Sequence, residues 1–374
     1  MITVLLGTRA QLIKMAPVIL ELENRGWQPQ LIMTGQHKET MDRLLEDFGI
    51  RTQPSRLYDG PEVTSIKRVI PWFLCCLWRL LKDAKQLFPA RGGKGVVLVH
   101  GDTFSTLLGA LAGKLTGQRV GHIESGLRSF RMFHPFPEEL TRLAVFRLTD
   151  LAFCPDDWAL SNLKGYRAHA INTQGNTLID ALRLALDIGK PLPLVPPARN
   201  FGVVSLHRFE NIFKRERLLD ILALIEEAAC RYPLVFVLHP ATRRNLEKFG
   251  LYKRLAGNPR FQLWPRMGYF EFVSLLRRSA FVITDGGSNQ EELSYLRKPT
   301  LLMRCATERQ EGLGDNVVLC EYKREKVVAF VDGLPAEGCR MEPLANGSPS
   351  AAIADVLTPF AGTAQAVTAK DQER

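Results

Sequence analysis

Three carboxylate residues occur close together in the chain, each just beyond an expected strand or at the start of an expected helix. Asp102 follows the apolar run Val96–Val99, Glu124 follows the run Arg119–Ile123, and Glu138 opens a helical pattern after a proline-rich turn. One such residue is explained by helix capping, but three in a single βαβ unit favour a ligand site. Clustered carboxylates raise one another's proton affinity, so one of them can be protonated at neutral pH.

The first expected strand, Ile2–Leu6, also ends in residues suited to ligand binding. Gly7 permits a tight turn, and the start of the following helix can hold an anion with its free amide groups. Arg9 and Lys14 add positive charge there. The GxGxxG fingerprint is absent, so the sequence predicts an anion site without a nicotinamide cofactor.

The second half of the chain repeats this arrangement. His207 follows the expected strand Phe201–Leu206, and a Gly-Gly-Ser turn at residues 286–288 follows the strand Ala280–Thr284. A glycine-rich turn that opens a helix can bind phosphate through backbone amides, although a simple chain reversal often uses the same glycines. The turn therefore supports a phosphate site only together with other motifs.

These residues need a scaffold, and strands alternate with helical patterns on both sides of a linker. Lys190–Asn200 contains four prolines and predicts that linker. We therefore expect an α/β protein with two Rossmann-like domains facing a cleft. The expected bounds are residues 1–188 for the first domain, 189–200 for the linker, 201–358 for the second domain and 359–374 for a flexible tail.

The composition of the chain indicates which classes of partner and which cellular compartment to expect. A net charge of +10 favours anionic partners, but the basic residues are scattered and form no recognition motif, which argues against nucleic acid. A phosphorylated small molecule or a membrane surface suits the charge. Seven cysteines without paired or zinc-ligand spacing predict a reducing cytoplasm and no metal, and the strand-like start predicts no signal peptide.

The segment Ile66–Phe88 is unusually apolar for a helix of this class. Its apolar run is about half of the roughly 20 residues that a membrane span needs, so we do not expect it to cross a membrane. A helix packed on the core is the favoured interpretation. Exposed aromatic side chains from Trp72, Phe73 and Trp78 would instead form a subunit interface or touch a membrane surface.

The motifs, taken in order, are similar to those of the bacterial and archaeal UDP-N-acetylglucosamine 2-epimerases, which share the B-type glycosyltransferase (GT-B) fold. The resemblance runs from residue 4 to about residue 311 and covers both expected domains. The matching strings are GTRAQLIKMAPVI, TGQHKETMD, VLVHGDTFST, VGHIESGLRS, PFPEELTR, QGNTLIDAL, SLHRFEN, PRMGYFEFVSLL, TDGGSNQEE, KPTLLMR and ATERQE. Each string alone is weak evidence for the family, but the set of strings in this order is specific to it.

The resemblance implies roles for individual residues. The family's catalytic groups fall on Asp102, Glu124, Glu138 and His207. Residues implied to bind the UDP-sugar are Arg9, Lys14 and Arg142 at the diphosphate, Phe272 at the uracil, Glu292 at the ribose, Gly286, Gly287 and Ser288 in the phosphate turn, and Arg309 as a further candidate. Gln36 and His37 match a segment that binds a regulatory second substrate molecule in non-hydrolysing members.

The implied reaction is epimerisation at C2 of a UDP-N-acetylhexosamine, by anti elimination of UDP and its re-addition, without a cofactor. One group must remove the C2 proton and another must return one from the opposite face, so more than one carboxyl is expected. Which carboxyl is the acid stays open. The product would be UDP-ManNAc or a relative, made for surface polysaccharide, and family habit implies a homodimer.

Several strings depart from the family pattern. The sequence has GTRAQ for GTRPE, TDGGSNQEE for TDSGGVQEE and ATERQE for TTERPE, while His134 and Phe136 replace a common Ser and Trp. These changes suggest a paralogue that acts on a modified UDP-N-acetylhexosamine. Alternatives are a hydrolysing epimerase that releases ManNAc and UDP, a GT-B glycosyltransferase, or a UDP-sugar-binding protein without activity.

Overall fold

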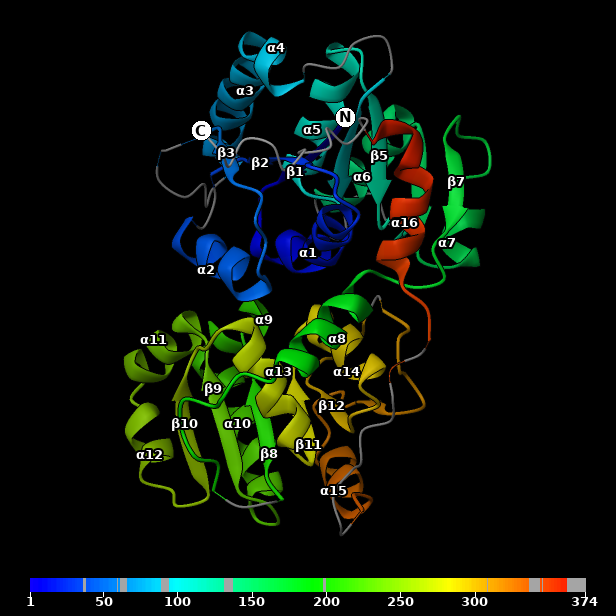
Figure 1. Ribbon diagram of the computed structural model, residues 1–374. Helices are drawn as coiled ribbons and strands as arrows, with labels where there is room; N and C mark the ends of the chain where they lie inside the picture. Colours follow the sequence, from blue (N-terminus) through cyan, green and yellow to red (C-terminus); the bar gives the residue numbers. More distant parts are fainter. Residues whose placement is uncertain are drawn as a thin grey trace, which may run out of the picture. The chain divides into compact units, whose positions relative to one another are not determined.

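The protein forms two compact units, one from Met1–Ala181 with Gly347–Arg374 and the other from Leu182–Asn346. This computed structural model describes residues 1–35, 38–58, 60, 66–88, 94–130, 137–197, 200–307, 309–335, 344 and 346–361. Each unit is a parallel sheet with helices against it (Figure 1). The predicted α/β class is confirmed.

Unit 1 contains a seven-stranded parallel sheet in the order β3-β2-β1-β4-β5-β6-β7. Its central strands are buried along their whole length, as expected for a parallel sheet covered on both faces. The strands are β1 (Ile2–Leu6), β2 (Gln30–Met33), β3 (Pro54–Arg56), β4 (Val96–His100), β5 (Arg119–Ile123), β6 (Leu151–Cys154) and β7 (His169–Asn172). The helices are α1 (Arg9–Asn24), α2 (Lys38–Phe48), α3 (Ile66–Lys82), α4 (Ala84–Leu87), α5 (Phe104–Leu115), α6 (Glu138–Leu148), α7 (Asp157–Ser161) and α16 (Pro349–Leu357), and α8 (Leu178–Ile188) runs into unit 2.

Unit 2 contains a six-stranded parallel sheet in the order β10-β9-β8-β11-β12-β13. The strands are β8 (Gly202–Ser205), β9 (Leu234–Leu238), β10 (Phe261–Pro265), β11 (Phe281–Thr284), β12 (Thr300–Leu302) and β13 (Val317–Leu319). The helices are α9 (Phe209–Ile212), α10 (Arg215–Ala229), α11 (Pro240–Lys248), α12 (Tyr252–Ala256), α13 (Tyr269–Arg278), α14 (Gly287–Tyr295) and α15 (Arg324–Asp332).

The strand order reverses once in each sheet. In unit 1 the chain moves outward from β1 to β3 and then returns to place β4 on the other side of β1, and in unit 2 the same reversal lies between β8 and β11. Loops on the two sides of such a switch point lead in opposite directions, which leaves a crevice at the carboxyl ends of the strands. Each unit therefore has one position where its fold favours ligand binding.

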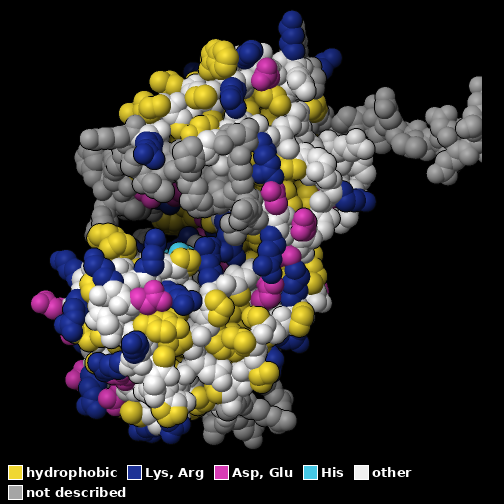
Figure 2. Space-filling model, turned by 90° about the vertical axis from the view of Figure 1, so that its left-hand side faces the viewer, with side chains coloured by type: hydrophobic (Ala, Val, Ile, Leu, Met, Phe, Trp, Pro, Cys, Tyr) yellow, Lys and Arg dark blue, Asp and Glu magenta, His cyan; other side chains and the backbone are white. Residues whose placement is uncertain are grey.

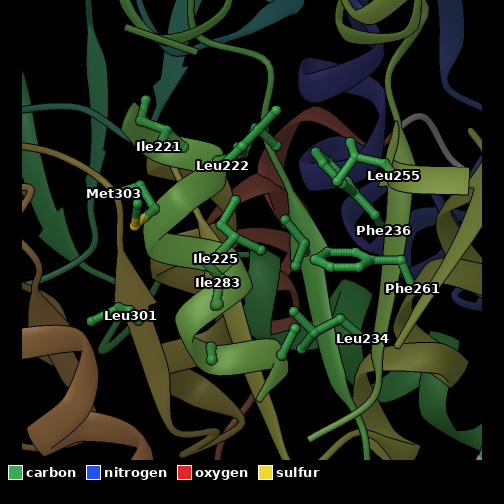
Figure 3. Close-up of a cluster of buried hydrophobic side chains, with 14 of the residues drawn as sticks. Ile221, Leu222, Ile225, Leu234, Phe236, Leu255, Phe261, Ile283, Leu301 and Met303 are labelled. Atoms are coloured by element: carbon green, nitrogen blue, oxygen red, sulfur yellow. The ribbon is translucent and has the colours of Figure 1, made fainter. Parts of the chain in front are cut away.

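A continuous apolar core fixes the strands of unit 2. In Figure 3, Ile221, Leu222 and Ile225 of α10 face the sheet residues Phe236 and Ile283. All five side chains are at most 1% exposed. Burying a side chain of this size contributes about 1.5–3 kcal/mol, so this layer holds the ends of β8 and β11 in a constant geometry.

Helix α16 belongs to unit 1, whereas the expected second domain extended to residue 358. It packs against α1, where Arg25 Nη1 lies 2.7 Å from Asp355 Oδ1. At its first turn the Ser350 amide donates to Asp180 at 2.9 Å. These long-range contacts carry no local signature in the sequence. Residues 362–374 of the expected tail lie outside the described residues.

Helix α3 buries one apolar face and exposes another. Trp72, Cys76 and Leu80 are buried, while Leu74 and Trp78 are 60% and 59% exposed. Figure 2 shows hydrophobic side chains beside lysine and arginine side chains over the upper part of the molecule. Both interpretations of this segment, core packing and an exposed apolar surface, thus apply to different faces. None of the helices in the described ranges has the length and apolar character of a membrane span.

Candidate functional residues at the switch point of each unit

Gly7 and Gln11 connect the two strands at the switch point of unit 1. A Cβ at Gly7 would lie 1.8 Å from Ser105 Oγ, so only glycine lets α5 approach the end of β1 this closely. Gln11 accepts from the Gly7 amide at 2.9 Å and donates to the His100 carbonyl at 2.7 Å. The glutamine that departs from the family string therefore ties β1 to β4 and fixes the start of α1, where Arg9 lies.

Glu124 is paired with Lys14 of α1, and the side chain of His100 at the end of β4 lies beside the same oxygen. Lys14 Nζ lies 2.7 Å from Glu124 Oε2, and His100 Nε2 lies 2.9 Å from the same oxygen. All three side chains are less than 10% exposed. Glu124 has a φ of 62°, a left-handed conformation that costs a non-glycine residue roughly 1–3 kcal/mol. Packing thus holds this carboxylate in a strained position just past β5.

Asp102 is paired with a different cation. Arg142 Nη2 lies 2.5 Å from Asp102 Oδ2, and Arg142 Nη1 lies 3.3 Å from Glu139 Oε2. Burial raises the pKa of Glu139, but the Ser129 amide and the guanidiniums of Arg128 and Arg142 outweigh burial, so this pKa lies below its usual value. Glu139 thus serves as a buried anchor that aims Arg142 at Asp102.

His122 supports the turn that carries Asp102. Its Nε2 donates to the Gly101 carbonyl at 2.8 Å, and Gly101 has a φ of 68° that favours glycine. Burial lowers the pKa of His122 to about 4 and outweighs the opposing effect of that hydrogen bond. The imidazole is therefore neutral at pH 7 and acts as a fixed donor beneath the turn.

Glu138 differs from the other two carboxylates. It begins α6, and its Oε2 is buried with no hydrogen-bond partner among the described residues. Buried carboxylate oxygens normally find a donor, so an unpaired one points to a functional reason. This oxygen makes Glu138 a candidate for contact with a ligand.

His207 and Asp285 meet at the switch point of unit 2. His207 Nδ1 lies 3.3 Å from Asp285 Oδ1, and Asp285 is fully buried at the end of β11. A Cβ at Gly286 would lie 2.8 Å from His207 Cε1, so glycine is required where the ring approaches the backbone. The histidine and the glycine turn, predicted separately, thus form one contact.

The other predicted residues of unit 2 lie along the same edge of the sheet. Gly287 and the exposed Ser288 begin α14, whose amides face the position after β11, and Glu292 is buried further along this helix. Phe272 is half-buried on α13, which follows β10. Arg309 pairs with Glu291 at 2.8 Å, which ties its loop to α14.

Several site residues were not expected from the sequence. Five further residues contact a predicted residue or the loop that carries it: His100, His122, Glu139, Asp285 and Asn211. Each lies within a few positions of a predicted residue in the chain, and that proximity is the signal that could have identified them. Gln36, His37, His134 and Phe136 lie outside the described residues.

The sequence of this chain is similar to those of known proteins. A model of the family described as UDP-N-acetylglucosamine 2-epimerase matches residues 20–358. A relative of that name from Methanocaldococcus jannaschii is 30% identical over 383 residues, which cover 96% of this chain and 98% of the relative. A Bacillus subtilis relative of the same name is 32% identical over 315 residues, 82% of this chain and 79% of the relative.

Solved structures of proteins with the same name have a similar fold. The structure of UDP-GlcNAc 2-epimerase from Methanocaldococcus jannaschii has a TM-score of 0.78 and 27% identity, and the match covers 96% of this chain and 99% of that one. Its complex with UDP-GlcNAc and UDP has a TM-score of 0.75 and 28% identity over the same shares. The matches extend over both units.

Proposed function

Because this chain belongs to the UDP-N-acetylglucosamine 2-epimerase family, we propose that it inverts C2 of a UDP-N-acetylhexosamine by anti elimination and re-addition of UDP. The observation that carries this proposal is the set of three carboxylates around the switch point of unit 1. Two are held in ion pairs and one has a buried oxygen without a partner among the described residues. Removing a proton from one carbon and returning a proton to it needs one group that acts as a base and another that acts as an acid.

We assign proton exchange with the substrate to Glu138, because its Oε2 is buried and has no hydrogen-bond partner among the described residues. Asp102 and Glu124 keep their cations close by, and these cations can stabilise negative charge that develops during elimination. Arg9, at the start of α1, adds positive charge for the diphosphate.

We assign the nucleotide to unit 2. His207 and the Gly286–Ser288 turn supply donors for a departing diphosphate, since a helix N-terminus and an imidazole both stabilise an anion. Phe272 offers an aromatic face for the uracil and Glu292 a carboxylate for the ribose. Arg309, held by Glu291, is a further diphosphate candidate.

The substrate and biological role are narrower proposals. Relatives solved with UDP-GlcNAc support UDP-GlcNAc or a modified relative as substrate, with UDP-ManNAc or its counterpart as product for surface polysaccharide. Exposed free thiols at Cys230 and Cys305 suit a reducing cytoplasm. We keep Gln36 and His37 as candidates for regulation by a second substrate molecule.

We also propose a homodimer formed through the exposed face of α3. Ile70, Leu74 and Trp78 lie four residues apart and are each about 60% exposed, so they form one apolar stripe along the helix. Such a stripe is typical of a surface covered by another molecule. A second copy is the occupant we propose, and weak contact with a membrane surface is the alternative.

One incubation with UDP-GlcNAc in D₂O, followed by NMR, tests the function. The expected product is UDP-ManNAc with deuterium at C2. Free ManNAc with UDP would instead identify a hydrolysing epimerase, and turnover only with an added acceptor would identify a glycosyltransferase. Binding without turnover of this or any modified UDP-N-acetylhexosamine would contradict enzymatic activity.

A further inference from the structure

We infer that Asp285 is a positioning residue that holds the His207 imidazole in one tautomer, with the proton on Nδ1 and Nε2 left for the ligand. This inference rests on the proposed function, because it gives His207 its role toward the departing diphosphate. The contact that carries it is the 3.3 Å separation of His207 Nδ1 and Asp285 Oδ1.

Asp285 is itself held rigidly. Its side chain is fully buried, and its two oxygens accept from the backbone amides of His207 and Arg208 and from Asn211 Nδ2, each at 3.0 Å. A carboxylate with this many donors has no freedom to rotate away from the imidazole. Because a carboxylate only accepts hydrogen bonds, the nitrogen that faces it must carry a proton.

A second layer of side chains fixes this carboxylate from behind. Asn211 is fully buried, and its Nδ2 also donates to the Met303 carbonyl at 3.1 Å. The Tyr322 hydroxyl donates to Asn211 Oδ1 at 2.7 Å, which decides the orientation of the amide. The guanidinium of Arg217 lies 3.4 Å from the centre of the Tyr322 ring. Tyr322, Asn211, Asp285 and His207 thus form one chain of contacts.

The ring is also confined on another side. Gly286 lies so close that an added Cβ would meet His207 Cε1 at 2.8 Å. The side chain of His207 nevertheless stays 40% exposed, so the imidazole is available to a ligand while its Nδ1 is occupied. These two constraints leave Nε2 as the nitrogen that can meet a diphosphate oxygen.

Fixing the tautomer has a chemical consequence. When the imidazole is protonated, Nε2–H donates to the leaving diphosphate, and the nearby Asp285 carboxylate balances the ring's positive charge. When the imidazole is neutral, Nε2 carries a lone pair and repels an anion. Asp285 therefore directs Nε2, and not Nδ1, toward the departing group.

A purely structural role for Asp285 would be to tie the loop after β8 to the end of β11. That role explains the two amide contacts but does not require either tautomer of the imidazole. The two roles differ in the tautomer that they predict, because free neutral imidazole favours the proton on Nε2. The tautomer can be read directly, without substrate.

The test is ¹⁵N NMR of the histidine-labelled full chain without ligand, at a pH where the imidazole is neutral. His207→Gln identifies the signal. The expected result is the Nδ1–H tautomer in the wild-type protein and the Nε2–H tautomer in Asp285→Asn. The amide oxygen should keep the three donors at Oδ2, which turns its NH₂ toward Nδ1. An Nε2–H signal in the wild-type protein would overturn the inference, whether or not the enzyme is an epimerase.

Kinetics supply the second measurement. We expect kcat of Asp285→Asn to fall by about 10²-fold or more with little change in KM. A general acid–base group that is misoriented loses a rate contribution of about this size. Tyr322→Phe, which keeps the carboxylate, should lose about 2- to 10-fold in kcat, the effect of one hydrogen bond. The matched control is Asp180→Asn, a buried carboxylate of unit 1 that accepts from Ser350, and its kcat should stay normal. Normal kcat in a folded Asp285→Asn would overturn the inference.

Discussion

Lys14 and Glu124 form a buried ion pair, with 2.7 Å between Nζ and Oε2, although 110 residues separate them in the chain. The lysine comes from α1 and the glutamate follows β5, so the pair reaches across the end of β4. Breaking a buried pair by removing one partner leaves an uncompensated charge. Stability and the proposed catalysis therefore depend on the same ion pair.

Lys14→Met should destabilise the protein by about 3 kcal/mol and abolish turnover, because it leaves the Glu124 carboxylate without its cation. Urea unfolding followed by circular dichroism measures the change. Adding Glu124→Gln to the same chain should recover a large part of the lost stability while activity stays absent. Losses in free energy that simply add in the double variant would show that the two side chains do not interact.

Glu138→Gln should separate activity from stability. Its Oε2 has no hydrogen-bond partner among the described residues, so replacing the carboxyl with an amide removes little that holds the fold together. We expect an unfolding free energy within about 1 kcal/mol of wild type and a kcat lower by about 10²–10⁴-fold. Deuterium incorporation at C2 should fall in parallel. A folded variant with wild-type kcat would remove Glu138 from the mechanism.

His122 should make the stability of the protein depend on pH. Its pKa is about 4 in the folded protein, against 6.5 in a model peptide, so between these values the unfolded chain binds more protons. Stability should therefore fall by about 3 kcal/mol as pH drops from 6.5 to 4. Glu139, whose folded pKa lies below 4.5, adds a further loss only below that value.

His122→Gln tests this assignment, because it keeps a donor for the Gly101 carbonyl but cannot titrate. Urea midpoints measured from pH 4.5 to 7.5 should depend less on pH in this variant than in the wild-type protein. The matched control is His169→Gln at an exposed histidine, which should keep the wild-type slope. Equal slopes in all three proteins would mean that other groups dominate the pH dependence.

The exposed stripe of α3 should control assembly. Leu74→Gln together with Trp78→Gln should convert a dimer into a monomer in multi-angle light scattering at micromolar concentration. Trp158→Gln, which changes another exposed tryptophan of unit 1, should leave the mass unchanged. A wild-type monomer that binds anionic vesicles through the same two residues would instead support the membrane alternative.

The sequence predicted the strand ends better than the contacts between them. Asp102 follows the continuous apolar run Val96–Val99, and Glu124 follows the expected strand Arg119–Ile123, so both strand ends could be predicted from the sequence. Their cations could not be assigned, since the pairing of Lys14 with Glu124 requires that β5 lie two strands from β1. His207 and Asp285, 78 residues apart, meet for the same reason. Strand order is a property of the whole sheet, and no local pattern contains it.

Short or partly exposed elements were also missed. Strand β3 has three half-buried residues and begins with Pro54, so it lacks the apolar run of an inner strand. Strand β13 is three residues long, with one of them buried. Proline favours the first turn of a helix, but α3 begins at Ile66 and Pro71 lies in its interior. Tertiary packing decides such elements more than their own residues do.

Unit 1 is built from two segments that flank unit 2 in the chain, and α16 closes it against α1. During synthesis on a ribosome, unit 2 is a continuous segment that can fold once it emerges. Unit 1 is complete only when α16 has been made, with its contacts from Asp355 to Arg25 and from Ser350 to Asp180. Because domains fold as units during synthesis, we expect unit 1 to reach its final structure only after the second unit has been made.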